Sequence, residues 1–404
     1  MKAKLLLSLI LISFSMFSFA AKTPGWQTIN TSDTMFCSNL STFTSDSNGN
    51  LYQAGWANQN GNDYGFIRKS IDKGYTWNTL FNFPNYGLMA FAIDQQGAFY
   101  VAGSQDPNYW IIQKSTDGGQ TWNTVDEAPQ FSSVTTLAIA PNGDIYAGGP
   151  GPDIGHSIIR KSADNGKTWT TVDDFYIGIN KAKSNNTKFN KTKSNQSKAH
   201  HADGSGEINA IFFDASGNVY YIVESTWLDT WYVRMSTDQG ATWTTIDSFS
   251  LGNWVLIGSS AVIDSAGNIY VAGLWTDEDA SNIGHWIVRK GSKTSPFVTV
   301  DDFKYPDNKR ITAPDKIVID KNGNLYVSGE VIDEESSPKT RALIRMSTDA
   351  GAHWSTWDDF PGDPNDRFFS ANHILIDNQG NLYAGLALTD ADFNDRWLTR
   401  KYFP

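Results

Sequence analysis

The sequence predicts an all-β protein, a seven-bladed β-propeller whose blades are four-stranded antiparallel sheets. Three observations support this fold class. A hairpin segment of about twelve residues occurs seven times, and a nine-residue segment occurs five times. The chain is also rich in glycine and aromatic residues, with 34 Gly, 15 Trp, 16 Tyr and 23 Phe among 404 residues. This composition suits many strands joined by tight turns.

Each hairpin segment joins a short apolar run to a second strand through a Gly/Asn turn, as in VIDSAGNIYVAG from Val262. After a variable polar loop, a third strand such as WIIQKS (110–115) leads into the nine-residue segment, and a fourth strand follows. Four strands per repeat fit the period of propeller blades. The other six hairpin segments begin at Thr44, Ala92, Ala138, Phe212, Val318 and Leu375.

The two ends of the chain complement each other. The seventh repeat stops after its third strand, at RWLTRKYFP, and TPGWQTI (23–29) matches the fourth-strand segment GKTWTTV (166–172). We therefore expect the N-terminal strand to complete the last blade and close the ring, which removes exposed sheet edges. The fifth repeat departs from the pattern: KGSKTSPFVTV (290–300) lacks the Asp and has Phe297 in the Trp position.

Residues 1–20 are expected to be a signal peptide, and residues 21–404 the propeller. Lys2 and Lys4 precede a short apolar run and small residues that end at Ala20. The protein is therefore expected to be secreted or periplasmic, without stable membrane insertion. An insertion at 180–207, between the third and fourth blades, is polar, rich in Lys and Asn, and expected to be disordered. The alternative is that it contacts an anionic cell-surface polymer.

The formal net charge is −11, although the insertion is basic. An acidic body repels nucleic acid and anionic membranes, which leaves glycans, peptides and cations as ligands. Cys37 is the single cysteine, so no internal disulfide can form. The six His residues show no metal-ligand spacing. We therefore expect no cofactor and no metal, and a monomer.

The nine-residue segment, such as KSTDGGQTW (114–122), looks catalytic but has a sufficient structural reason. Its Ser and Asp side chains can bond backbone amides in a tight turn, its Gly supplies a positive φ, and its Trp can wedge between sheets. Five copies of the segment in one chain favour a structural role over a catalytic one. The residues assigned to this structural role are Asp72, Trp77, Asp117, Trp122, Asp164, Trp169, Asp238, Trp243, Asp349 and Trp354.

This segment resembles the Asp-box, or bacterial neuraminidase repeat, over nearly the whole chain after residue 20. The resemblance implies that each box forms the turn between the third and fourth strands, on the rim away from the ligand face. The resemblance also suggests sialidase activity. In that family this activity requires three Arg residues, a Tyr with a Glu, and an Asp. The N-terminal Phe/Tyr-Arg-Ile-Pro motif of that family is missing, since the first arginine is Arg68. No carboxylate pair for another glycosidase stands out.

Three further patterns recur from blade to blade. An Arg just before the nine-residue segment is expected to bond a neighbouring blade. An Asp-Asp-Phe triplet after the fourth strand occurs at 173–175, 301–303 and 358–360. It is either a carboxylate cluster that binds a cation or a solvated strand end. A Trp shared by four third strands is expected to be core. The Arg set is Arg68, Arg160, Arg234, Arg289, Arg345 and Arg400, and the Trp set is Trp110, Trp231, Trp286 and Trp397.

Ligands of propellers bind on the face built by the loops from strand two to three and from strand four to the next blade. Aromatic rings beside carboxylates and amides suit carbohydrate, whereas the alternative for each ring is packing between blades. The candidate binding residues are Trp56, Tyr64, Trp227, Trp254, Trp275, Asp277, Arg310 and Arg367. The sequence thus favours a binding module for a glycan or protein ligand. The alternatives are a glycoside hydrolase (sialidase-like) or polysaccharide lyase, and an assembly factor for another exported protein.

Overall fold

The computed structural model describes the chain except for its first residues and several loops. The predicted signal peptide lies outside the described residues, as does the insertion apart from 206–207. The described residues contain no helix with the length and hydropathy of a membrane span. They are 24–32, 35–36, 38–59, 62–105, 109–131, 133–178, 206–225, 229–251, 255–276, 284–306, 311–332, 340–361, 366–390, 392 and 394–404.

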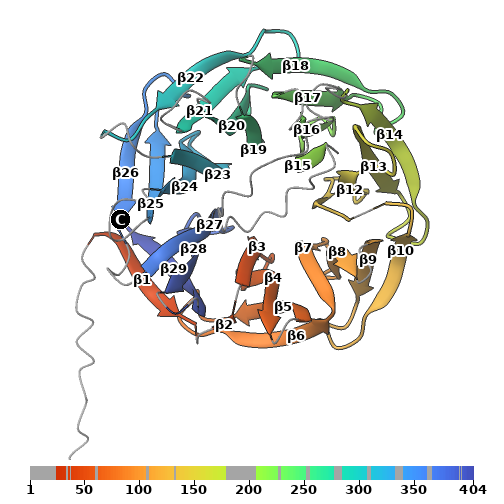
Figure 1. Ribbon diagram of the computed structural model, residues 1–404, viewed down its shortest axis with the longest axis horizontal. Coiled ribbons are helices and arrows are strands. Elements are labelled where there is room, and N and C mark those ends of the chain that lie inside the picture. Colours follow the sequence, from red (N-terminus) through yellow and green to blue (C-terminus); the bar gives the residue numbers. More distant parts are fainter. Residues whose placement is uncertain are drawn as a thin grey trace, which may run out of the picture.

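The strands form seven antiparallel sheets arranged in a ring, and this confirms the predicted seven-bladed β-propeller (Figure 1). In each blade the first strand lies nearest the ring axis and the fourth lies outermost. Blade 1 contains β3 (Ser38–Ser45), β4 (Leu51–Gln59), β5 (Asn62–Ser70) and β6 (Asn78–Pro84). Blade 2 contains β7 (Tyr86–Ile93), β8 (Phe99–Gln105), β9 (Tyr109–Ser115) and β10 (Asn123–Ala128).

Blades 3 to 6 repeat this order. Blade 3 contains β11 (Thr136–Ile139), β12 (Ile145–Pro150), β13 (His156–Ser162) and β14 (Thr170–Tyr176). Blade 4 contains β15 (Glu207–Phe213), β16 (Val219–Ser225), β17 (Thr230–Ser236) and β18 (Thr244–Ser250). Blade 5 contains β19 (Val255–Ile263), β20 (Ile269–Thr276), β21 (Gly284–Gly291) and β22 (Val298–Phe303). Blade 6 contains β23 (Ile311–Ile319), β24 (Leu325–Ile332), β25 (Thr340–Ser347) and β26 (Ser355–Phe360).

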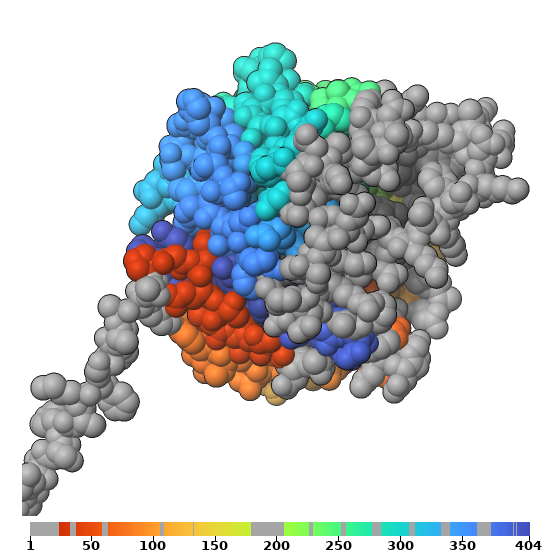
Figure 2. Space-filling view, turned by 60° about the vertical axis from the view of Figure 1, so that its left-hand side comes forward, coloured from red at the N-terminus to blue at the C-terminus, as the bar shows by residue number. Residues whose placement is uncertain are grey.

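Blade 7 closes the ring as the sequence predicts. It combines β27 (Asp366–Ile376), β28 (Leu382–Asp390) and β29 (Asn394–Phe403) with the N-terminal strand β1 (Gly25–Thr31). The short strand β2 (Met35–Phe36), which the repeat pattern does not predict, adds to β29. Figure 2 shows the red N-terminal strand against the dark blue C-terminal segment. The ring of Trp26 meets that of Trp357 in blade 6 with centroids 5.5 Å apart, so β1 is also packed against its neighbour.

The antiparallel order separates two faces of the ring. The start of β4 at Leu51 pairs with the end of β5 at Ser70, so the turns after strands one and three lie on the same side. We call this side the turn face. The loops from strand two to three and from strand four to the next blade lie on the other side, the loop face.

The core lies between blades. Trp110, Trp231, Trp286 and Trp397 are fully buried, which confirms that they are core residues. Each faces a second-strand Gly of the next blade: a Cβ on Gly273 would lie 2.2 Å from the ring of Trp231. The large ring and the absent side chain are therefore complementary.

Two of the three interfaces that lack the Trp also lack the Gly. Blade 3 has the small Ser157 in the Trp position, and blade 4 has Val223 in place of the Gly. Blade 6 has Ala342, and it packs with Leu386, which stands in the Gly position of blade 7. Volume is thus conserved across these two interfaces although the residues differ, as close packing requires.

Candidate functional site

The polar side chains of each nine-residue turn form hydrogen bonds within that turn. In blade 2, both carboxylate oxygens of Asp117 accept bonds from Thr121, with Thr121 N to Oδ1 at 2.9 Å and Thr121 Oγ1 to Oδ2 at 2.6 Å. The Ser115 hydroxyl donates to Oδ1 at 2.8 Å, and Trp122 Nε1 donates to Gly119 O at 3.0 Å. These bonds stabilise the charged form and lower the pKa of Asp117 to about 2. The carboxylate is therefore part of the turn, with both oxygens hydrogen-bonded.

The same bonds recur in the other four turns. In each, the Ser hydroxyl donates to the Asp, and the backbone N–H four residues after the Asp donates to the same oxygen. Hydrogen bonds to the charged form lower the pKa of Asp164, Asp238 and Asp349 to about 2. The scaffold interpretation of these acids agrees with this geometry.

A second acidic turn follows the first strand on the same face. In blade 4, Asp214 accepts bonds from the backbone N–H groups of Ser216 and Asn218, from the Asn218 amide and from the Tyr220 hydroxyl. Asp46, Asp264, Asp320 and Asp377 accept the corresponding bonds in their blades. The described acids of these turns are therefore structural too.

Neighbouring blades also bind each other through the nine-residue turns. Lys161 Nζ and the Tyr146 hydroxyl of blade 3 both donate to the carbonyl of Gln239, in the turn of blade 4, at 3.0 Å. Lys114 does the same to Asn165, and Lys290 to Ala350. These acceptor residues have positive φ, so the donors hold a strained part of each turn. The Lys is replaced by Met235 and Met346 in blades 4 and 6, whose following blades lack an intact nine-residue turn.

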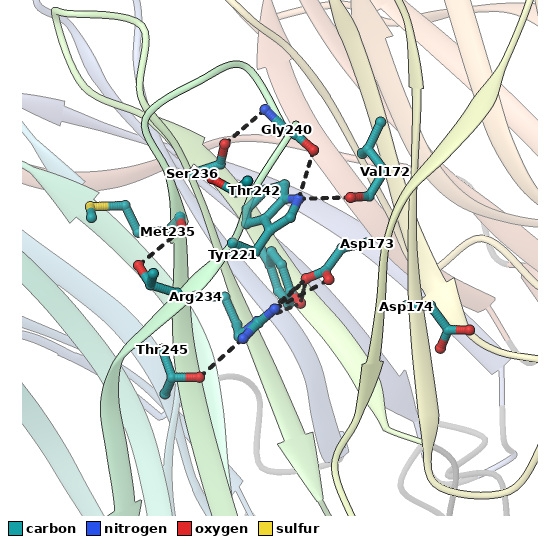
Figure 3. A network of polar contacts seen from close by, with 12 residues as sticks. Val172, Asp173, Asp174, Tyr221, Arg234, Met235, Ser236, Gly240, Thr242 and Thr245 are labelled. Carbon is teal, nitrogen blue, oxygen red and sulfur yellow. Dashed lines mark hydrogen bonds and ion pairs between the residues drawn. The ribbon is translucent and has the colours of Figure 1, made fainter.

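The recurring Arg forms a second connection between blades (Figure 3). Arg234 of blade 4 donates from Nη2 to Asp173 Oδ2 of blade 3 at 2.9 Å, and the Tyr221 hydroxyl donates to the same oxygen at 2.5 Å. The guanidinium also lies over the ring of Phe175, 4.2 Å from its centroid. Both charged side chains are mostly buried. We call this arrangement the Arg–Asp clamp.

The clamp occurs at five of the seven interfaces, which confirms that the Arg bonds a neighbouring blade. The pairs are Arg160–Asp126, Arg234–Asp173, Arg289–Asp247, Arg345–Asp301 and Arg400–Asp358. The first Asp and the Phe of each Asp-Asp-Phe triplet belong to a clamp. For that first Asp, both interpretations of the triplet were therefore wrong, because the carboxylate is buried against a guanidinium and neither solvated nor free for a cation.

The remaining two interfaces lack a complete clamp. Blade 2 has Gln113 where other blades have Arg, and blade 1 has Phe81 where blades 2 to 6 have Asp. Both partners are thus replaced together, and the ring of Phe81 instead packs at 5.8 Å from that of Trp122. At the closing interface, Asn30 of β1 takes the Asp position opposite Arg68. A buried charge without a partner is costly, so a joint replacement is the physical expectation.

The second Asp of each triplet points to the loop face, where it forms a pair that the sequence analysis missed. His156 Nδ1 lies 2.6 Å from Asp174 Oδ1, and His285 Nδ1 lies 2.7 Å from Asp302 Oδ1. Arg341 takes the same position in blade 6 and binds Asp359. The available signal was the position of His156, His285 and Arg341, each four residues before the clamp Arg.

Three predicted binding residues have described side chains. Trp56 on β4 and Tyr64 on β5 are half-buried in blade 1, and Trp275 on β20 is half-buried in blade 5. Trp275 stacks on His285 with ring centroids 3.5 Å apart, and so it joins the His285–Asp302 pair. Trp56 and Tyr64 belong to a different part of the ring. The structure therefore does not bring these three residues into one site.

The other predicted binding residues are not described. Trp227, Trp254, Asp277 and Arg310 lie outside the described residues, and Arg367 lies in β27 with its side chain outside the description. Their roles stay predictions. Within the described residues, no group of three or more His, Cys, Asp or Glu side chains is arranged to hold a metal ion.

Similar proteins share the fold of this chain. No protein-family model matches it, and a comparison with curated proteins finds no relative. A structure described as YCF48 bound to D1 peptide is 13% identical with a TM-score of 0.55, over 95% of this chain and 98% of the other. Polysaccharide lyase Uly1 is 10% identical with a TM-score of 0.57, over 91% and 90%. A protein from Lactobacillus plantarum is 13% identical with a TM-score of 0.56, over 85% and 92%.

At these identities the likeness establishes the scaffold. The class of protein is therefore a seven-bladed β-propeller, a fold that carries many unrelated functions. Its function must be argued from the polar and aromatic groups of the loop face.

Proposed function

We propose that this protein is an exported β-propeller of the Asp-box type that binds a glycan or protein ligand on its loop face. The observation that carries the proposal is the contrast between the two faces. On the turn face, the described Asp carboxylates are occupied inside their own turns. On the loop face, the carboxylates of Asp174 and Asp302 are about half exposed, and each is oriented by a His.

Orientation matters because binding is weakened by the entropy of ordering flexible side chains. The carboxylates of Asp174 and Asp302 are held on regular strands by hydrogen bonds, so little freedom remains to be lost. Aromatic rings lie beside both: Tyr176 at His156, with centroids 5.1 Å apart, and Trp275 at His285. Such a combination of apolar faces and fixed acceptors suits sugar hydroxyls as well as polar peptide groups.

The second candidate function is a glycoside hydrolase or polysaccharide lyase on the same scaffold. The observation that favours it is that a His oriented by a carboxylate is a general base in many enzymes. One of the similar propellers is a polysaccharide lyase. A lyase would use His156 or His285 to remove a proton from the sugar ring.

One experiment on the protein lacking residues 1–20 separates these functions. A glycan array and a peptide array would report binding, and fluorogenic glycosides and anionic polysaccharides would report turnover. We expect binding without turnover, weakened by Asp174→Asn or Asp302→Asn and unchanged by His353→Thr on the turn face. Turnover that either Asn variant abolishes would replace the binding proposal with the enzymatic one. Absence of binding to every glycan and peptide would contradict the proposed function.

A further inference from the structure

The loop-face end of blade 3 carries an exposed patch that combines apolar, aromatic and acidic groups. Ile154 is 53% exposed and Tyr176 is 52% exposed, although both are large apolar side chains. The Asp174 side chain is 53% exposed and that of His156 is 29% exposed. We call these four residues the blade 3 patch. Exposed large apolar groups beside a polar pair are typical of interaction sites.

The strand register explains why these side chains gather. His156, the first residue of β13, lies directly opposite Tyr176, the last residue of β14, and Asp174 is two residues before Tyr176. Side chains two apart on a strand share a face, so all three project together. Ile154 lies in the loop that leads into β13. The patch is therefore held by regular strands at its polar end.

We infer that the blade 3 patch binds a basic side chain of a peptide ligand flanked by an apolar residue. The inference rests on the proposed function and names its ligand class. It stands on the exposed Tyr176 and Ile154, the fixed Asp174 carboxylate and the acidic charge of the protein.

Charge complementarity selects the ligand. His156 holds one oxygen of Asp174, and the second oxygen has no bonded partner among the described residues. A Lys or Arg of the ligand can donate to that oxygen in a charge-assisted hydrogen bond. The exposed ring of Tyr176 offers the same cation a π face, and Ile154 offers apolar contact to its neighbour. The net charge of −11 attracts basic peptides over a longer range.

The experiment uses fluorescein-labelled heptapeptide pools with Lys fixed at the centre, and matched pools with Gln at the centre. Fluorescence anisotropy with the protein lacking residues 1–20 gives the affinity at pH 7.5. We expect the Lys pool to bind about tenfold more tightly than the Gln pool. Asp174→Asn and Tyr176→Ala should each weaken binding of the Lys pool, by about tenfold and about threefold.

One further variant is a control on the opposite face. His353→Thr removes the exposed pair of His353 with Asp349, 2.6 Å long, from the turn face. It restores the Thr of the other turns and should leave binding unchanged. Circular dichroism would check that each variant is folded.

Equal affinity for the Lys and Gln pools, or unchanged binding in Asp174→Asn, would overturn the inference. Oligosaccharide binding that Asp174→Asn abolishes would assign the patch to glycans, which overturns the inference and keeps the proposed function. A ligand bound by the wild type with equal affinity in Asp174→Asn and Tyr176→Ala would place the site elsewhere on the loop face, which overturns the inference. A wild type that binds nothing on either array would contradict the proposed function itself.

Discussion

Arg234 and Asp173 join two neighbouring blades through a buried ion pair, with Arg234 Nη2 2.9 Å from Asp173 Oδ2 (Figure 3). The two side chains are each 11% exposed, and the hydroxyl of Tyr221 completes the carboxylate's bonds. Because Asp173 lies on the fourth strand of one blade and Arg234 on the third strand of the next, the pair fixes the angle between two sheets. Four other interfaces repeat it.

Replacing Arg234 by Ala should reduce the free energy of unfolding by about 3–5 kcal/mol, because it leaves the Asp173 carboxylate buried without a cation. Urea unfolding followed by Trp fluorescence measures this loss. Arg341→Ala is the matched control: its partner Asp359 is 33% exposed, so it should cost less than about 1 kcal/mol. Equal losses in both variants would show that burial does not distinguish the two pairs.

The interface between blades 1 and 2 allows the clamp to be built where it is missing. Gln113→Arg alone should destabilise the protein because its guanidinium would lack a carboxylate, and Phe81→Asp alone because it removes the packing against Trp122. The double variant should recover part of the sum, with a coupling energy of about 0.5–3 kcal/mol. A double-mutant cycle in urea measures this coupling, and purely additive losses would contradict the pairing.

Asp117 should contribute to stability and not to ligand recognition. Hydrogen bonds from Thr121 lower its pKa to about 2 from the ordinary 3.8. A lowered pKa stabilises the folded state above the unfolded-state pKa, and this contribution disappears as the pH falls from about 4 to about 2. Asp117→Ala should therefore lower the Tm by a few degrees at pH 7, and the difference from wild type should shrink toward pH 2.

Two measurements check this prediction. Thermal unfolding from pH 7 to pH 2 gives the difference in Tm, and a glycan or peptide found by the arrays gives the affinity at neutral pH. Loss of binding in Asp117→Ala protein that still folds would contradict the scaffold role of the turn.

Gly273→Ala should be strongly destabilising. A Cβ there would lie 2.2 Å from the ring of Trp231 and 2.4 Å from the backbone oxygen of Ile257, and neither can move freely. Overpacking of this kind costs about 1–3 kcal/mol or more. Gly87→Ala is the control, because a Cβ there meets only the flexible hydroxyl of Ser104 at 3.0 Å. Urea midpoints compare the two variants, and similar stabilities would refute tight packing between blades 4 and 5.

Removing residues 21–31 should expose β29 as an unpaired edge, because β1 is its outer neighbour. Exposed edges pair with other chains, so we expect a lower Tm and concentration-dependent association. Light scattering after size exclusion measures the association, and a synthetic peptide of residues 21–31 added in trans should reverse it. A monomer with the wild-type Tm would show that β1 is dispensable.

The repeat pattern was enough to predict the architecture. Each blade is built from local hairpins, and a blade buries its apolar faces only against its neighbours, so a repeated hairpin implies a repeated sheet. The match of 23–29 to an internal fourth strand predicted closure, and β1 confirms it. The recurrence of Arg in six blades predicted a scaffold role, because a substrate site draws on few blades.

The residues of the loop face could be predicted much less well. Asp173 and Asp174 are adjacent and identical, yet one is buried in a clamp and the other is half exposed beside His156. Their surroundings differ because neighbouring side chains on a strand point to opposite faces of the sheet. A bulge between Ile159 and Arg160 sets the register. The partners are also far apart: Arg234 lies 61 residues after Asp173.

The sequence by itself determined the seven-bladed scaffold, the closing strand and the acidic charge, because these depend on local periodicity and composition. The tertiary structure alone decided which Asp faces a neighbouring blade and which faces solvent, and which His it meets. That choice depends on strand register and on contacts between blades, and a repeat pattern contains neither.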